Sequence, residues 1–212
     1  MKKTEIILVA FLLIGLTFKV FLIPLAGTIT TLSTMSLAII YYIFSFAFFN
    51  GIKLKAIFVK DSYKETSVLR IIGSVTTGIG LSSTLIGILF KIQNWPLANN
   101  SISAGLFLLI PITIISVIKL FKSRAPFYAK ILLRTTIISA AGILFLILTR
   151  TDIVKIEFRN YPDYVKAFEL YTADPQNDSL RKNLDLEFNR TFMDEESFND
   201  YKNNIYNQKE NK

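Results

Sequence analysis

Five long apolar runs constrain the fold of this chain more than any other feature of its sequence. They span residues 6–24, 32–49, 71–92, 102–118 and 131–148. A run of this length matches a bilayer hydrocarbon core of about 30 Å, which a helix of roughly 20 residues crosses. Helices are the expected form because every backbone N–H and C=O group needs an internal partner in hydrocarbon. We therefore expect an all-α polytopic membrane protein with five transmembrane helices.

The charge of the chain is divided unevenly between these runs and the sequence that follows them. The net charge is +8, yet residues 1–149 hold 14 Lys and Arg against 3 Asp and Glu, while residues 150–212 hold 10 against 13. The basic excess lies in short loops, which is typical of topology signals rather than of nucleic-acid binding. We expect a transmembrane domain at 1–150, a polar helical extracytoplasmic tail at 151–212, and no nucleic-acid partner.

The positions of the basic residues also predict an orientation. Twelve basic residues lie at three places in the sequence. Two precede the first apolar run, five lie between the second and third runs, and five lie in or beside the segment between the fourth and fifth runs. The other two connections have none, so the positive-inside rule places the N-terminus in the cytoplasm and the tail outside. We expect a multi-pass protein of a bacterial inner membrane with a periplasmic C-terminus. The basic start and first run are also similar to a signal peptide. In "IPLAG", however, Pro24 or Ile23 stands where the spacing of a cleavage site requires a small residue, so we expect this helix to stay.

A stretch near the first proline recurs 72 residues later. "LIGLTFKVFLIPLA" at 13–26 and "LIGILFKIQNWPLA" at 85–98 are identical at eight of 14 positions. Each copy opens a helical hairpin, at 6–49 and 71–118, and an even number of helices per copy makes the two hairpins parallel repeats. Because proline lacks a backbone N–H group, Pro24 and Pro96 are expected to end the first and third helices. The predicted fold is thus two repeated hairpins, a fifth helix at 131–148 and a small helical tail.

A stripe of small residues runs along the third predicted helix. Its members recur at spacings of 4, 3, 4 and 3, which places them on one face: Gly73, Thr77, Gly80, Thr84 and Gly87. Small residues allow close helix packing within a membrane. Lys91 is the next position on this face, so it is predicted to project along a packed seam, and Lys19 bears the same relation to Gly15 in the first copy.

Three interpretations of these two lysines remain open. They extend to the headgroups from a helix end, they bind a carboxylate or an ion in a shared space between helices, or they bond to carbonyl groups of the turns. The apolar runs contain no Asp or Glu. A charged partner of Lys91 within the membrane would then come from another chain, a lipid or a ligand. The candidate functional or packing residues are Lys91, Lys19, Trp95, Pro96, Asn94, Gly87, Gly80 and Gly73.

The chain contains no cysteine and no histidine. Disulfides, thiolate catalysis and imidazole metal sites are excluded. With no acid in the apolar runs, we expect no enzyme, no cofactor and no metal. The leading hypothesis is a non-enzymatic interaction or scaffold protein that contacts membrane lipids and a membrane or periplasmic partner, or a second copy. The alternative is a small transporter or channel for anions, with its site at the repeat interface near Lys19 and Lys91.

The segment "LFKIQNWPLA" resembles a helix-end signature of GldL-type gliding-motility inner-membrane proteins, which read approximately Leu-Phe-Lys-Ile-x-His-Trp-Pro-Gly-Ala. The resemblance covers about 50 residues, from 71 to about 119, with a degraded copy in the first hairpin. Asn94 stands in place of the family's histidine and Leu97 in place of its glycine. The resemblance implies an accessory component of a gliding or secretion assembly, with Lys91 as the intramembrane lysine. The family's intramembrane glutamate on the following helix has no counterpart here.

The polar tail shows three apolar stripes at helical spacing. The first comprises Tyr161, Tyr164, Val165, Phe168 and Tyr171, the second Leu180, Leu184 and Phe188, and the third Phe198, Tyr201 and Ile205. The segment "DPQND" predicts a turn with Asn177 or Asp178 as helix N-cap. We expect either a small helical hairpin near the membrane surface or a docking site for a periplasmic protein.

Overall fold

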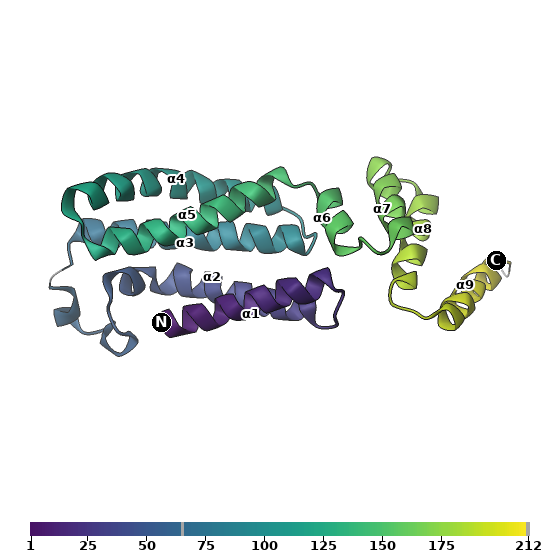
Figure 1. Ribbon diagram of the computed structural model, residues 1–212, viewed down its shortest axis with the longest axis horizontal. Helices are drawn as coiled ribbons and strands as arrows, with labels where there is room; N and C mark the ends of the chain where they lie inside the picture. Colours follow the sequence, from purple (N-terminus) through teal and green to yellow (C-terminus); the bar gives the residue numbers. More distant parts are fainter. Residues whose placement is uncertain (65, 211–212) are drawn as a thin grey trace. The chain divides into compact units, whose positions relative to one another are not determined.

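The computed structural model describes the backbone of residues 1–64 and 66–210 and the side chains of residues 1–64 and 66–202. This part of the chain is all-helical and contains no strand (Figure 1). Contacts divide the chain into two compact units, Met1–Arg150 and Thr151–Lys212. The first unit contains the five long helices and two short 3-10 helices, and the second consists mainly of short helices.

The five long helices follow the five apolar runs but begin earlier in the sequence than the runs do. They are α1 (Lys2–Val20), α2 (Ala26–Asn50), α3 (Val68–Ile92), α4 (Ala98–Ser123) and α5 (Pro126–Ile147). Helices α2 to α5 are each long and apolar enough to cross a membrane. Helix α1 has 19 residues and includes four charged ones: Lys2, Lys3, Glu5 and Lys19. Two short 3-10 helices, η1 (Leu54–Ala56) and η2 (Lys60–Tyr63), lie in the connection between α2 and α3.

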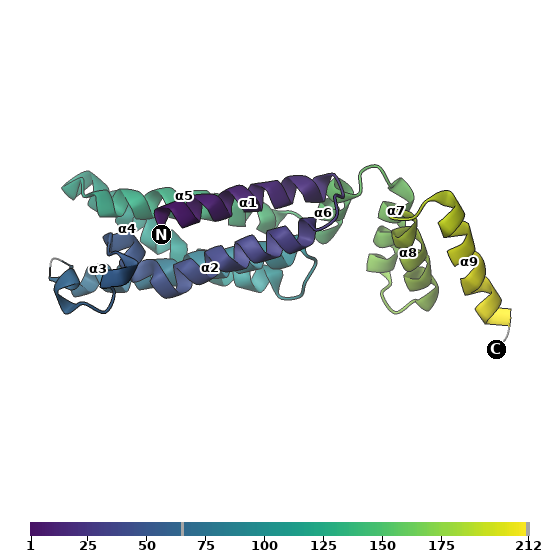
Figure 2. The same cartoon turned by 90° about the horizontal axis from the view of Figure 1, so that it is seen from below.

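Helix α3 is the central element of the first unit. It packs against α2, α4 and α5, while α1 packs mainly against α2 (Figures 1 and 2). The main apolar core joins α2, α3, α4 and α5 through residues that are almost inaccessible to solvent, among them Leu37, Tyr41, Leu81, Leu109 and Ile131. Because α3 is surrounded by three helices, it contains the largest share of buried positions. Helices α1 and α5, in contrast, leave much of their apolar surface exposed.

Small residues bring these helices into close contact. A Cβ atom at Gly78 of α3 would overlap Ser45 and the carbonyl oxygen of Tyr41 on α2. A Cβ at Gly105 of α4 would lie 2.6 Å from the backbone nitrogen of Thr84 on α3. Helix backbones approach this closely only where side chains are minimal, which is the usual packing of helices in membranes.

The turns of the two hairpins have the same backbone form. Helices α1 and α3 end at Val20 and Ile92, and each is followed by two left-handed residues three positions apart. These are Leu22 (φ 53°) and Leu25 (φ 68°) in the first turn, and Asn94 (φ 56°) and Leu97 (φ 63°) in the second. Pro24 and Pro96 lie inside the turns, so each helix ends four residues before its proline. The left-handed residues reverse the chain in both hairpins.

The second unit contains α6 (Arg150–Glu157, whose first residue belongs to the first unit), α7 (Pro162–Ala173), α8 (Asp178–Arg190) and α9 (Glu195–Glu210). Its core is aromatic: the ring of Tyr164 lies 4.4 Å from that of Phe158 and 5.6 Å from that of Phe188. Asn177 caps α8, because its side-chain oxygen accepts hydrogen bonds from the backbone of Ser179 and Leu180. The predicted turn and N-cap are thus found. The side chain of Ile205, in the third predicted stripe, lies outside the described side chains.

Candidate functional site

A buried ion pair joins the first and the fifth helix. Glu5, in the first turn of α1, is 7% exposed. Its two carboxylate oxygens accept hydrogen bonds from Nε and Nη2 of Arg134 on α5, each at 2.6 Å. The hydroxyl of Tyr41 on α2 donates a third bond, at 2.5 Å, to the oxygen that Nε contacts. The paired geometry is the strong form of an arginine–carboxylate contact.

The surroundings of Arg134 are aromatic on one side. Its guanidinium carbon lies 4.8 Å from the ring centre of Phe48 and 6.0 Å from that of Phe49. Nη1 donates to the backbone carbonyl of Lys130, one turn earlier in α5. The arginine is therefore held by a carboxylate, a carbonyl group and two rings, an environment that fixes its orientation.

This ion pair shows that an acidic side chain of the same chain lies within the helix bundle, although the apolar runs themselves contain none. The apolar run starts at residue 6, which left Glu5 outside the predicted span. Helix α1 begins at Lys2 instead, so Glu5 is a helical residue that faces α2 and α5. One sequence signal could have found the pair: Arg134 is the sole charged residue within the run 131–148 and requires a partner.

Lys91 lies at the other end of the bundle, in the last turn of α3. It is 5% exposed, and its ammonium group donates to Oδ1 of Asn99 in the first turn of α4, at 2.7 Å. Its bonding partner is thus a neutral amide of the same chain. Of the three sequence interpretations, this is closest to a structural bond within the turn, although the acceptor is a side chain and not a backbone carbonyl.

A cavity of about 480 Å³ adjoins Lys91. Its lining comes from the end of α3, the start of α4 and the end of α5, and includes Lys91, Asn99, Asn100 and Arg150. Arg150 also donates to the carbonyl oxygen of Trp95, at 3.3 Å. Among the described residues that line this cavity, two are basic and none is acidic, so the cavity favours an anion.

The other predicted turn residues lie near Lys91 but have different surroundings. Trp95 is 42% exposed and packs edge-on against Phe90, and Pro96 is exposed in the same turn. Asn94 buries its side-chain oxygen, which accepts no hydrogen bond within the described structure. Lys19 is half-buried at the end of α1 and is not part of the cavity lining. The structure thus does not bring the two lysines into one cavity.

The three predicted glycines differ in their packing. A Cβ at Gly87 would lie 2.5 Å from the backbone nitrogen of Ile102, and one at Gly80 would lie 2.8 Å from the side chain of Leu109, both on α4. A Cβ at Gly73 would meet no atom within 4 Å. The small-residue stripe is therefore a close α3–α4 contact at Gly80 and Gly87 and not at Gly73, which lies near the start of α3.

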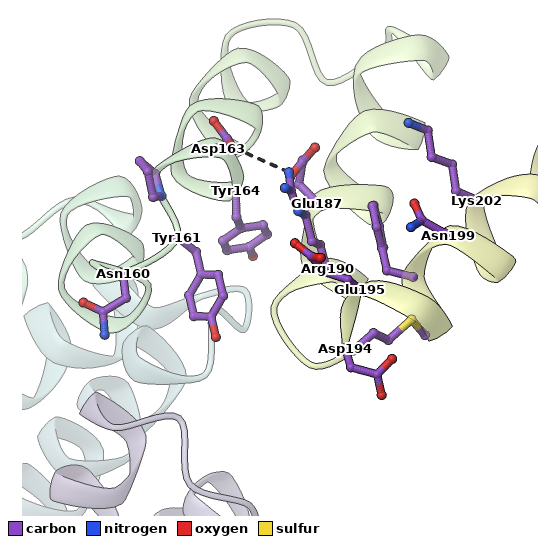
Figure 3. Close-up of a pocket in the computed structure, with 13 residues that line it drawn as sticks. Asn160, Tyr161, Asp163, Tyr164, Glu187, Arg190, Asp194, Glu195, Asn199 and Lys202 are labelled. Atoms are coloured by element: carbon purple, nitrogen blue, oxygen red, sulfur yellow. Dashed lines mark ion pairs between the residues drawn. The ribbon is translucent and has the colours of Figure 1, made fainter.

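The second unit holds a separate cavity of about 560 Å³ (Figure 3). Arg190 of α8 lies within its wall and pairs with Asp163 at 3.6 Å and with Glu187 at 3.8 Å. The remaining lining includes Tyr161, Tyr164 and Phe198. Burial raises the pKa of Tyr164 to about 12, and the nearby charge of Glu157 adds to this shift. The charges of this cavity are mixed and largely paired with each other.

Hydrogen bonds and ion pairs also shift two pKa values at the surface of this unit. The hydrogen bond and charge of Glu169 raise the pKa of Lys155. The backbone N–H of Ser197 lowers the pKa of Asp194, whose carboxylate accepts from it at 2.8 Å. Across the described residues, no cluster of three acidic side chains has a geometry that could hold a metal ion.

Comparison with known proteins does not assign the chain to a family. No protein-family model matches the chain, and no curated protein or solved structure is detectably similar to it. The class defined by the fold is that of an all-helical protein whose four apolar helices indicate several membrane passes.

Proposed function

We propose that this chain is a non-enzymatic membrane protein that binds an acidic group of a partner protein at the cavity beside Lys91. The observation that supports this most directly is the pairing of Lys91 and Arg150 around one cavity without a lining acid. A buried cation retains a favourable interaction with an anion, since little water screens it. The partner's carboxylate would then accept hydrogen bonds from Arg150 and from Lys91. Lys91 would also keep its hydrogen bond to Oδ1 of Asn99.

The proposal includes α1 as a fifth membrane span. With 19 residues and a rise of about 1.5 Å per residue, α1 is about 28 Å long, close to the bilayer core thickness. Its acidic residue is neutralised by Arg134, which lowers the cost of placing both charges near the membrane. Five spans would put the N-terminus and the tail on opposite sides, with the basic loops in the cytoplasm of a bacterial cell.

The two hairpins are proposed to be parallel repeats. The ends of α1 and α3, the starts of α2 and α4, the left-handed residues and the turn bonds correspond at an offset of 72. Ile23 donates to Phe18 and Trp95 to Phe90, at 2.9 and 2.8 Å. The two copies differ in one respect that matters here: Lys91 borders the cavity, whereas Lys19 does not.

The resemblance of "LFKIQNWPLA" to GldL-type proteins gives this proposal a context. It suggests an accessory role in a gliding or secretion assembly of the inner membrane, with the α3–α4 hairpin as the shared module. The buried environment of Lys91 is compatible with such a role. The acid that GldL-type proteins hold on the following helix would be supplied here by the partner.

Site-specific photo-crosslinking in native membranes tests the proposal. A photoreactive amino acid at Asn100, which lines the cavity and is exposed, would capture the partner. In the double variant Lys91→Met/Arg150→Gln, we expect capture to fall at least tenfold, roughly the effect of losing one charge-assisted hydrogen bond. Lys19→Met is the matched control, because it removes the corresponding lysine of the first hairpin, and it should leave capture unchanged.

The same variants distinguish partner binding from the alternative function, which is a small anion transporter with a site near Lys19 and Lys91. If uptake of anions into vesicles depends on Lys91 while crosslinking recovers lipid alone, the transporter is the better description. Equal capture by the double variant and the wild type would refute binding at this cavity. The captured peptide must also contain an Asp or Glu, and a peptide without one would count against the proposed chemistry.

A further inference from the structure

We propose that the basic end of the helix bundle holds a specific site for an anionic phospholipid. The site is a cavity of about 670 Å³ between the start of α1, the end of α2 and the start of α5. It lies at the opposite end of the bundle from Lys91, at the end that contains the N-terminus and the α2–α3 connection (Figure 1). This inference rests on the membrane location and is independent of the partner-binding proposal.

The cationic groups around this cavity provide the charge complementarity. Lys2, Lys53, Lys130 and Arg134 all line it, and they come from three separate elements. Among its described lining residues none is acidic. Arg134 is already neutralised by Glu5, so the three lysines, all of them exposed, supply the uncompensated charge.

The remaining wall of the cavity is apolar and is suited to contact the acyl chains of a phospholipid. It contains Phe48, Ile52, Leu54 and Leu133. Leu133 is 60% exposed on α5, and such an apolar side chain at a membrane-facing position offers a surface along which an acyl chain lies. A soluble anion such as phosphate would use the lysines but not this wall, so the combination favours a lipid.

The Glu5–Arg134 ion pair fixes the relative position of two helices that line the site. It ties α1 to α5 directly beside the cavity, through two bonds of 2.6 Å. The start of α1, with Lys2, and the start of α5, with Lys130, are thereby held close enough to face one headgroup. This is the arrangement that distinguishes a built site from a diffuse basic surface.

Native mass spectrometry of the full chain, released from nanodiscs, tests the site. We expect retained phosphatidylglycerol to exceed phosphatidylcholine at equal mole fraction in the wild type. The triple variant Lys2→Gln/Lys53→Gln/Lys130→Gln should reduce retained phosphatidylglycerol at least tenfold, since each basic residue contributes about a fivefold effect near an anionic surface. The matched control, Lys60→Gln/Lys119→Gln/Lys122→Gln, removes the same charge outside the cavity and should retain the lipid.

The outcomes separate the alternatives. An equal loss in the control variant would show diffuse electrostatic attraction and overturn the site. Equal retention of both lipids by the wild type would overturn the charge selectivity, and this measurement needs no variant to fold. If inorganic phosphate displaces the lipid at low millimolar concentration, the apolar wall contributes nothing and a lipid-specific site is refuted.

Discussion

The carboxylate of Glu5 and the guanidinium of Arg134 are 129 residues apart in the sequence, yet they form two hydrogen bonds of 2.6 Å within the helix bundle. The pair joins the most peripheral of the long helices, α1, to α5, with which it otherwise shares few contacts. A buried charge without its partner is costly, whereas the intact pair is nearly neutral in stability. The pair therefore fixes the position of α1 more than it adds net stability.

The first prediction concerns this pair. Glu5→Ala should lower the free energy of unfolding by about 3 kcal/mol, because it leaves Arg134, whose side chain is 14% exposed, without a counter-charge. Arg134→Met should have a similar cost, and the double variant should lose clearly less than the sum of the two. A double-mutant cycle measured by unfolding in mixed detergent micelles checks this. Strictly additive losses would show that the two side chains do not interact.

The second prediction isolates the tyrosine that completes this cluster. Tyr41→Phe removes a hydrogen bond to an ionised group and should cost about 1.5–3 kcal/mol in the same unfolding measurement. Tyr42, its neighbour on α2, is 62% exposed. Tyr42→Phe is therefore the control, with a change expected within about 0.5 kcal/mol. Equal effects of the two variants would mean that the Tyr41 bond is not formed.

The third prediction compares two glycines of one helix. A Cβ at Gly78 would overlap Ser45 and a backbone carbonyl oxygen of α2, so Gly78→Ala should destabilise the fold by about 1–3 kcal/mol. A Cβ at Gly73 meets open space. Gly73→Ala should instead raise stability by up to about 1 kcal/mol, because alanine favours the helix. Thermal denaturation in detergent distinguishes the two, and destabilisation by both would contradict the described packing of α3.

The sequence predicted the helical class because long apolar runs have few alternatives in a membrane. It also predicted the turns between paired helices and the Asn177 cap, since these depend on local residue types. The Glu5–Arg134 pair and the central position of α3 depend on contacts between distant segments, which periodicity does not encode. Gly73 illustrates the same limit: spacing placed it on the stripe with Gly80 and Gly87, but α4 does not reach it.

The last prediction concerns the start of α9, where Asp194 accepts a hydrogen bond from the backbone N–H of Ser197 at 2.8 Å. This bond lowers the pKa of Asp194 below its usual 3.8. A carboxyl group with a lowered pKa stabilises the fold at pH values above its unfolded pKa. The contribution is lost as pH falls through the folded pKa, because protonation removes the charge that the helix N-terminus favours.

The chemical shift of the Ser197 amide, measured on selectively ¹⁵N-serine-labelled protein in micelles, should therefore be constant from pH 7 to about pH 5 and change below about pH 4. Asp194→Asn keeps an acceptor at the cap but cannot titrate in this range, so it should abolish the change while retaining the helix start. Glu195→Gln is the control for a neighbouring acid and should leave the transition in place. A transition that persists in Asp194→Asn would assign it to another group and contradict the described cap.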